Sequence, residues 1–177
     1  DQEAVEDYQY QNQSKLNYSA QDLSGIYDSS QVMTGQPVYL DLTCRVDLDI
    51  DYRFTAPEMT PGNQALFSGS YRIRALPEDV DGWQRTIPLE DSSDFSGTSF
   101  SEAADLDVCE IRDLILEKEQ KTGTSNRWYT LVIRPEISYQ GQIGELPLEG
   151  EFRPEFQFQI DTSLMRLPGE EEQLKII

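Results

Sequence analysis

The sequence contains no histidine, only two cysteines and only four lysines among its 177 residues. Without histidine, neither Ser-His-Asp nor Cys-His catalysis is available, and His-ligated zinc is excluded. No Ser-Lys signature surrounds any of the lysines, and the sequence has no glycine-rich phosphate loop and no dinucleotide-binding pattern. We therefore predict that the domain is not an enzyme and that it uses no cofactor.

The two cysteines, Cys44 and Cys109, stand 65 residues apart, and neither belongs to a closely spaced pair. This spacing gives no support for a metal or redox motif. Two interpretations stay open at this point. A disulfide between the two would stabilise the fold by about 4 kcal/mol in the chain-entropy model, whereas two separate buried thiols would act only as small apolar side chains.

Long hydrophobic runs are also missing. The longest apolar stretches span only a few residues, far fewer than the ~20 needed to cross a bilayer, and the first residues have no signal-peptide pattern. The chain begins at Asp1 and ends after an acidic segment that contains Pro168 and Gly169. We expect a piece trimmed from a longer protein, with anchoring or targeting segments outside it and flexible ends at residues 1–7 and 168–177.

Basic residues are scarce relative to acidic ones. Fourteen lysines and arginines stand against 33 aspartates and glutamates, which gives a net charge of −19 and a pI near 4.1. This charge repels nucleic-acid backbones and anionic lipids, so we expect no nucleic acid and no direct membrane binding by this segment. It also fits a salt-adapted origin, in which the acidic surface serves solubility.

The clearest positive signal is an alternation of apolar and polar residues. From Val38 to Phe54 every even position is apolar, and every odd position except Tyr39 is polar. Because side chains alternate across a strand, this run predicts an antiparallel strand with one buried face. A straight strand of this length would span about 55 Å, so we expect it to bend, to bulge or to pass between two sheets.

Four further stretches alternate in the same way and are separated by turn residues such as those at 60–63. They cover residues 67–75, 83–89, 129–139 and 152–160. Regular spacing of this kind is typical of a β-sandwich. The sequence therefore predicts a single, mainly β domain over residues 1–177, an antiparallel β-sandwich of immunoglobulin-like or related type.

The remaining segments are predicted less directly. Pro135 interrupts one alternating stretch, and we expect it to mark a sheet edge, a bulge or a break between two strands. Residues 8–18 alternate weakly and fit an edge strand. Residues 90–98 predict a loop, and residues 100–106 predict a short strand.

One segment has helical periodicity instead. Asp107 and Glu110 have the spacing of a capping box, and apolar residues follow at intervals of three and four. Lys121 and Gly123 supply a favourable charge and a stop at the other end. We predict one helix over residues 107–121, packed across one end of the sandwich or over one sheet.

Three aspartates, Asp47, Asp49 and Asp51, fall on the outward face of the predicted long strand. A row of carboxylates can bind a hard cation such as calcium, and the spacing imitates the start of an EF-hand loop. However, position six of that motif is Tyr52 rather than glycine, and a strand does not wrap around an ion. We favour a solvated acidic face that discourages edge-to-edge pairing, with a metal site as the weaker interpretation.

Aromatic residues are the other candidates for ligand binding. Trp128 and Trp83, with nine tyrosines, could form a stacking platform for sugar rings. If Tyr129 faces inward, Trp128 faces outward and is the most exposed candidate, although packing between elements is the simpler interpretation for both tryptophans. Acidic residues could also serve a glycoside hydrolase, but 33 of them satisfy any required carboxylate separation, so no pair stands out.

Several short segments resemble an uncharacterised prokaryotic family, the domain of unknown function 5305 group. The segments that carry this resemblance are Gly35–Leu40 with Asp51–Phe54, Gly82–Trp83 with Thr86–Leu89, Lys121–Gly123 with Tyr129–Pro135, and Phe152–Phe158. The resemblance implies a membrane-anchored protein of archaea or bacteria with a β-rich extracytoplasmic domain. It defines no catalytic or binding residues.

These observations lead to one leading hypothesis and two alternatives. The leading hypothesis is a non-catalytic extracytoplasmic β-sandwich of a membrane-anchored protein, presenting a surface to an unknown protein or cell-envelope component. The first alternative is a carbohydrate-binding module that uses Trp128 and neighbouring tyrosines. The second is a carboxylate-dependent glycoside hydrolase.

Overall fold

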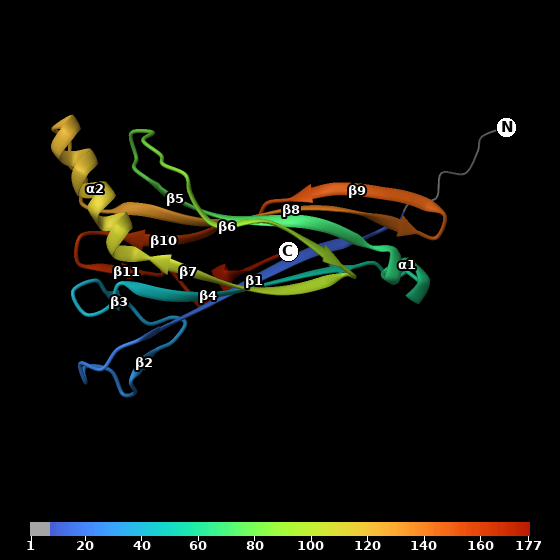
Figure 1. The fold of residues 1–177 in the computed structure, drawn as a ribbon, viewed down its shortest axis with the longest axis horizontal. Helices are drawn as coiled ribbons and strands as arrows, with labels where there is room; N and C mark the ends of the chain where they lie inside the picture. Colours follow the sequence, from blue (N-terminus) through green and yellow to red (C-terminus); the bar gives the residue numbers. More distant parts are fainter. Residues whose placement is uncertain (1–7) are drawn as a thin grey trace.

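The computed structural model describes residues 8–177, so the flexible end predicted for residues 1–7 lies outside the described part of the chain. Figure 1 shows two antiparallel sheets that pack against each other in an elongated sandwich, with one long helix at one end. The prediction of a mainly β, antiparallel sandwich is confirmed.

The smaller sheet has the strand order β12-β1-β4-β7, and β2 pairs with the end of β1. Its strands are β1 (Gln11–Gln21), β2 (Gln31–Val32), β4 (Arg45–Thr55), β7 (Ser99–Asp107) and β12 (Lys175–Ile176). β1 pairs with β4 along most of its length but has only two short strands on its other side. The stretch predicted as an edge strand is β1, which lies inside this sheet between β12 and β4. The prediction of an edge is therefore wrong, although only short strands pair on that side of β1.

The larger sheet has the order β3-β11-β10-β8-β5-β6, and β9 also pairs with β8. Its strands are β3 (Val38–Tyr39), β5 (Ser68–Glu78), β6 (Ile87–Ser96), β8 (Tyr129–Ile143), β9 (Leu146–Phe152), β10 (Phe156–Ile160) and β11 (Leu164–Arg166). The long strands β5 and β8 form its centre and pair over eleven positions.

The alternating run from Val38 to Phe54 passes between the two sheets, as one of the predicted options required. Its first residues form β3 in the larger sheet and its later residues form β4 in the smaller one. In between, the Leu42 and Thr43 amides both donate to the Tyr39 carbonyl at 3.1 Å, which turns the chain. Leu40 stays buried in this turn, but Leu42 and Cys44 are exposed, so the predicted inward face is interrupted there and resumes at Val46.

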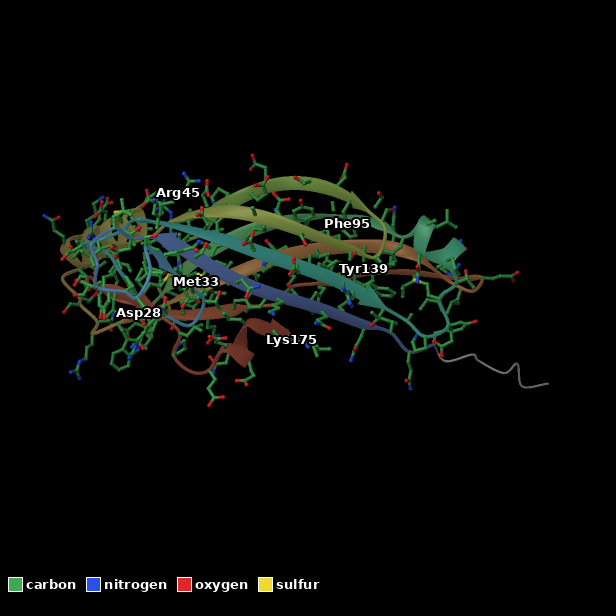
Figure 2. All side chains as sticks on the ribbon, turned by 90° about the horizontal axis from the view of Figure 1, so that it is seen from below. Asp28, Met33, Arg45, Phe95, Tyr139 and Lys175 are labelled. Carbon is green, nitrogen blue, oxygen red and sulfur yellow. A yellow bond between two sulfur atoms is a disulfide. The ribbon has the colours of Figure 1, made fainter. Side chains whose placement is uncertain are left out.

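The core lies between the two sheets and is built from the inward faces of the alternating strands. In β4, residues alternate strictly between exposed and buried from Arg45 to Thr55. Aromatic rings fill the half of the core nearest α1 (Pro61–Leu66), where Phe67 lies 4.5 Å from Phe54 and 5.7 Å from Tyr139 between ring centroids. Figure 2 shows Tyr139 in this half of the sandwich. Burying each such side chain contributes roughly 1.5–3 kcal/mol.

The prediction that Pro135 marks an edge, a bulge or a break is wrong. β8 runs without interruption from Tyr129 to Ile143 in the middle of the larger sheet, and Pro135 pairs with Ile73 of β5. On the other side of β8, the ladder with β10 ends at Ile133 and the ladder with β9 begins at Ile137. Pro135 therefore stands at a gap between two partner strands, where a missing N–H costs no ladder bond on that side.

The prediction of a loop at residues 90–98 is also wrong, because most of these residues belong to β6. This edge strand starts at Ile87 rather than at Trp83, which lies in the preceding turn. Its polar residues pair through the backbone with β5, from Ala75↔Ile87 to Ser68↔Ser96. Backbone pairing at an open edge needs no apolar side chains, so the sequence of this segment lacks the alternation that predicts a strand.

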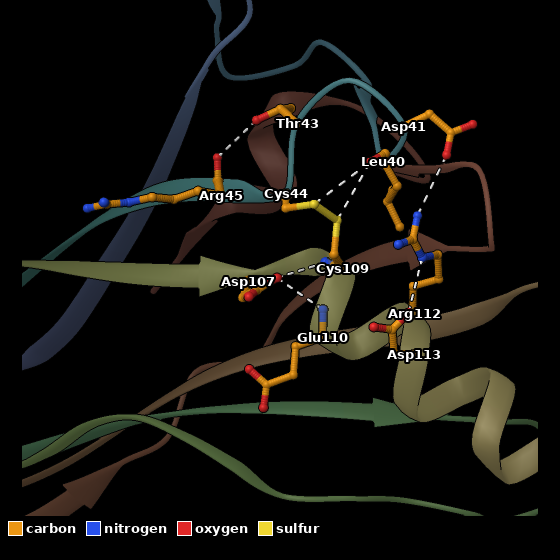
Figure 3. Close-up of a disulfide and its surroundings, with 10 residues drawn as sticks. All are labelled: Leu40, Asp41, Thr43, Cys44, Arg45, Asp107, Cys109, Glu110, Arg112 and Asp113. Carbon is orange, nitrogen blue, oxygen red and sulfur yellow. Dashed lines mark hydrogen bonds and ion pairs between the residues drawn. A yellow bond between two sulfur atoms is a disulfide. The ribbon is translucent and has the colours of Figure 1, made fainter.

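The predicted helix is α2 (Val108–Thr122), and its ends follow the predicted signals. Asp107 caps the start by accepting hydrogen bonds from the Cys109 and Glu110 amides, and Gly123 ends it with a left-handed φ of 68°. The Glu110 side chain points away from Asp107, so only half of the predicted capping box forms (Figure 3). Neither α1 nor α2 is long and apolar enough to cross a membrane.

Two short helices were not predicted. The expected turn at residues 60–63 starts α1, which has a full capping box between Thr60 and Asn63. At the other end of the chain, residues 168–177 were expected to be flexible, but they form the 3-10 helix η1 (Glu171–Leu174) and β12. Leu174 is buried in the core and β12 pairs with β1, which explains why this segment is ordered.

Candidate functional site

Exposed apolar side chains gather at one end of the sandwich. Twelve large apolar side chains are exposed in the described part of the chain, and eight of them lie at the end that carries α2, β2, β3 and the β5–β6 turn (Figure 1). We call this the apolar end, defined by Leu23, Ile26, Met33, Tyr39, Leu42, Val80, Leu116 and Trp128. Single exposed apolar residues are ordinary on a protein surface, whereas a large contiguous patch of them is typical of an interaction surface.

Part of the apolar end is hollowed. Ile26, Tyr27, Pro37, Tyr39 and Leu42 line a groove with a cavity volume of about 630 Å³, which we call the tyrosine groove. The rings of Tyr27 and Tyr39 lie 6.3 Å apart between centroids. The Tyr27 hydroxyl donates a 2.6 Å hydrogen bond to the Pro37 carbonyl, which fixes this ring against the opposite wall.

The loop that forms one wall of the tyrosine groove is held from below by Tyr18. The Tyr18 hydroxyl donates to the Gln36 carbonyl at 2.7 Å and accepts from the Gly35 amide at 2.9 Å. Gly35 has a left-handed φ of 95°, and a Cβ there would collide with the Glu171 side chain. The groove is therefore preformed rather than built from free loops.

The Tyr18 and Tyr27 phenols stay neutral at physiological pH. Burial raises the pKa of Tyr18 to about 12, and burial followed by the negative charge of Asp22 raises the pKa of Tyr27. A neutral phenol keeps its O–H, so both tyrosines continue to donate the hydrogen bonds described above.

The two tryptophans have different environments. Trp128 is 47% exposed and belongs to the apolar end, as the outward-facing alternative required. Trp83 is half-buried, packs against the core, and meets Tyr129 edge to face at 6.0 Å. Packing therefore accounts for Trp83, whereas Trp128 offers a free surface.

A buried ion pair anchors the β5–β6 turn to α2. The Lys118 ammonium lies 2.7 Å from an Asp79 carboxylate oxygen, and both side chains are almost fully buried. The same ammonium stands 5.8 Å from the Trp83 ring centre and 5.3 Å from the Tyr129 ring centre. Asp79 also accepts hydrogen bonds from the Asp81 and Trp83 amides, each at 2.9 Å. Every group has a partner, so this cluster supports the apolar end structurally.

The aspartate row is solvent-exposed on the outer face of the smaller sheet. Arg45 lies 3.5 Å from Asp47, and the Ser101 hydroxyl donates to Asp51 at 2.6 Å. Within residues 8–177, no group of three or more acidic, histidine or cysteine side chains is arranged to hold a metal ion. The row is a strand-borne acidic face in which Asp49 stands between two other carboxylates.

Other carboxylates gather on the outer face of the larger sheet. Glu136 is nearly buried and lies 3.1 Å from Arg72 and 2.9 Å from Arg74, an arrangement that braces β5 against β8. Asp94 and Glu149 line a hollow of about 790 Å³ on the same sheet. Glu151 lines the same hollow, so no single carboxylate pair stands out, and the hydrolase alternative stays a prediction.

Cys44 and Cys109 form a disulfide (Figure 3), which resolves the two interpretations that the sequence left open. Their Cα atoms are 5.0 Å apart, within the normal range for a disulfide. The bond joins the turn before β4 to the first turn of α2, where the Val108 amide also donates to the Cys44 carbonyl at 2.8 Å. It thereby ties the helix of the apolar end to the smaller sheet.

Sequence reasoning missed the tyrosine groove. One signal was present, because Tyr39 is the single apolar residue on the polar side of the long alternating run. A second was the pair Ile26 and Tyr27, two apolar residues inside a segment otherwise typical of a loop. The pairing of these two segments across the groove depends on tertiary structure.

No family model and no curated protein match the chain. Among solved structures, the putative ApaA protein from Bordetella pertussis is similar at 11% identity and a TM-score of 0.35, over 94% of this chain and all of that chain. A protein from Archaeoglobus fulgidus is similar at 12% identity and a TM-score of 0.31, over 71% of this chain and 94% of that chain.

Proposed function

We propose that the chain is a non-catalytic, extracytoplasmic domain of a membrane-anchored protein, and that its apolar end contacts a protein or cell-envelope partner. The observation that carries the proposal is the concentration of eight exposed large apolar side chains at one end of the sandwich. Interfaces use aromatic and large aliphatic side chains of this kind as anchors.

The tyrosine groove is the part of this surface best suited to receive an anchor from the partner. Its rigid tyrosine rings offer contact area at a small entropic cost, because their positions are already fixed by hydrogen bonds. Asp41 lines the groove beside Leu42, so a partner with a basic side chain next to an apolar one fits best.

Two observations support the proposed location. A disulfide across 65 residues is typical of proteins that fold in an oxidising compartment. The resemblance to the domain of unknown function 5305 group implies the same side of the membrane. Fractionation of cells that express the full-length gene product tests this location, with cleavage of the domain by protease added outside the cytoplasmic membrane as the readout. A cytosolic full-length protein without hydrophobic segments would contradict it.

Site-specific photo-crosslinking in the same cells tests the binding surface. A crosslinker at Leu42 should capture one discrete partner, and the substitution Tyr39→Asp should abolish this capture while leaving the folded fraction unchanged. A crosslinker at Leu146, an exposed apolar residue near the opposite end, is the matched control. Equal capture at Leu42 and Leu146, or capture that survives Tyr39→Asp, would count against the apolar end as the interface.

One observation favours the alternative function, carbohydrate binding through an aromatic platform, because Trp128 is exposed. On that alternative, Trp128→Ala abolishes glycan binding, whereas Trp83→Phe leaves it unchanged because Trp83 packs against Tyr129. Glycan binding that survives Trp128→Ala counts against a platform at this residue.

A further inference from the structure

A second hollow lies at the opposite end of the sandwich, beside α1. The start of β1, the end of β4 and Gln64 of α1 line it, and its cavity volume is about 920 Å³. We call it the amide groove, defined by Gln9, Tyr10, Gln11, Arg53, Gln64 and Thr98. None of the eight residues of the apolar end contributes to it.

The floor of the amide groove is rigid. Phe54 is buried beneath it, and the exposed Tyr10 ring stacks on Phe54 with centroids 5.4 Å apart and an interplanar angle of 23°. The Phe54 amide donates to the Thr98 carbonyl at 2.7 Å, which fixes the neighbouring wall. The Asn63 side chain bonds both the amide and the carbonyl of Gly144 at 3.1 Å, so α1 is held in place.

The lining of the amide groove differs from the rest of this acidic surface. Among residues 8–177, no carboxylate lines it, although 33 of the 177 residues of the whole chain are acidic. Within the described residues, the side chains of Gln11, Arg53 and Gln64 have no hydrogen-bond or ion-pair partner, so their donors and acceptors are available to a ligand. Amides offer both donors and acceptors, and the guanidinium offers donors in a fixed plane.

We propose that the amide groove binds a neutral oligosaccharide. The Tyr10 ring presents an exposed face to the apolar C–H face of a sugar, while amides, a guanidinium and hydroxyl groups match the sugar's hydroxyls. A net charge of −19 disfavours an acidic glycan. The unpaired polar side chains disfavour a purely apolar ligand, because such a ligand would desolvate them without replacing their hydrogen bonds.

The adjoining surface extends the site along the smaller sheet. Arg53 and Ser99 also line a neighbouring polar hollow of about 460 Å³, together with Gln13, Lys15, Asp51 and Ser101. These residues lie on the outward face of β1, β4 and β7. The two hollows share one wall, so the ligand is an extended chain of several sugars rather than a single ring.

The test is an NMR titration of the ¹⁵N-labelled chain with neutral hexasaccharides of glucose, xylose, mannose, galactose and N-acetylglucosamine at millimolar concentration. At least one of them should shift the side-chain amide signals of Gln11 and Gln64. Tyr10→Ala should weaken that binding by about tenfold. Gln64→Ala, at an exposed position of α1, should weaken it without changing the folded state, and Trp128→Ala should leave it unchanged.

Three results would overturn the proposal. The first is that no neutral hexasaccharide shifts the side-chain amide signals of Gln11 and Gln64. The second is binding that is lost with Trp128→Ala but kept with Tyr10→Ala and Gln64→Ala. The third is that only acidic glycans or peptides shift these signals. Tyr10→Ala also removes a ring that stacks on Phe54 and can unfold the protein. In that case the Gln64→Ala variant decides the test. The outcome is independent of the proposal for the apolar end, since neither Leu42 nor Tyr39 touches this groove.

Discussion

At the scale of single residues, the Lys118–Asp79 pair has the clearest energetic consequence. Lys118→Met removes the partner of a buried carboxylate, and we expect it to lower the free energy of unfolding. Adding Asp79→Asn to this variant should restore part of the loss, because a neutral amide oxygen still accepts from the Asp81 and Trp83 amides. Urea denaturation at neutral pH measures the free energy of unfolding of the wild type and the two variants. A double variant less stable than Lys118→Met would contradict the expectation.

The same carboxylate predicts a pH dependence. Burial acts to raise the pKa of Asp79, but hydrogen bonds from Lys118 and from the Trp83 and Asp81 amides outweigh it, so the pKa lies below its ordinary value of 3.8. A carboxyl with a lowered folded pKa contributes stability that is complete above its unfolded pKa and is lost as pH falls through the folded one. The stability gap between the wild type and Asp79→Asn should therefore narrow below about pH 4.

Urea titrations of both proteins from neutral pH to about pH 2 isolate this contribution, because all other carboxyl groups are common to the two chains. A gap that stays constant across the acid range would show that Asp79 is not stabilised in its charged form. Asp81→Asn is the matched control, since Asp81 contributes its backbone amide, rather than its carboxylate, to the bond with Asp79.

At the scale of elements, the disulfide connects α2 to the turn before β4. Replacing both cysteines with alanine should lower the free energy of unfolding by about 4 kcal/mol, because the unfolded chain regains the freedom of a long loop. Urea denaturation with and without reductant measures the effect. Reductant should bring the wild type to the stability of the variant and leave the variant unchanged, and a wild type insensitive to reductant would argue against the bond.

The short helix α1 depends on one buried side chain. Asn63→Ala removes the reciprocal cap with Thr60 and both bonds to Gly144, and we expect a loss of about 1–2 kcal/mol. Gln64→Ala, one residue further along and exposed, is the control and should change stability little. Thermal or urea unfolding compares the two variants, and equal stabilities would mean that the Asn63 bonds contribute nothing net.

Sequence periodicity predicted the strands that bury one face against the core and expose the other. β4, β5 and β7 each bury one face, so their side chains record the fold. β6 pairs mainly through its backbone at the sheet edge, so its sequence does not alternate and the strand was not predicted. The gap beside Pro135 is created by the ends of β9 and β10, so the residues around Pro135 do not indicate it. Asp107 and Gly123 predicted the ends of α2 because caps are local.

The candidate sites were predicted less well for the same reason. Trp128 could be placed on an outward face from its neighbours in sequence, and its exposure bears this out. The tyrosine groove joins Tyr27 to Tyr39 across a turn, and the amide groove joins Gln64 to Gln11 across two elements. Contacts between segments distant in sequence have no periodicity, so a single sequence does not specify them.

At the scale of the whole molecule, charge and apolar surface are distributed unevenly. The apolar end carries eight of the exposed large apolar side chains, and the aspartate row lies on the face between the two ends. At the other end, no carboxylate of the described part of the chain lines the amide groove. A net charge of −19 makes copies of the chain repel one another, which opposes self-association through the apolar end. The proposed contacts lie at the two ends of the sandwich, and the site at the amide groove continues along the outward face of the smaller sheet.

This distribution predicts how salt acts on stability. Because acidic residues outnumber basic ones by more than two to one, screening should relieve repulsion in the compact state, and the free energy of unfolding should rise from about 10 mM to about 1 M NaCl. Asp49→Asn, in the middle of the exposed aspartate row, should stabilise the protein at low salt and have little effect at high salt. Calcium chloride at matched ionic strength separates screening from binding. An extra stabilisation by calcium that disappears in Asp49→Asn would favour the metal interpretation of the row over the acidic face.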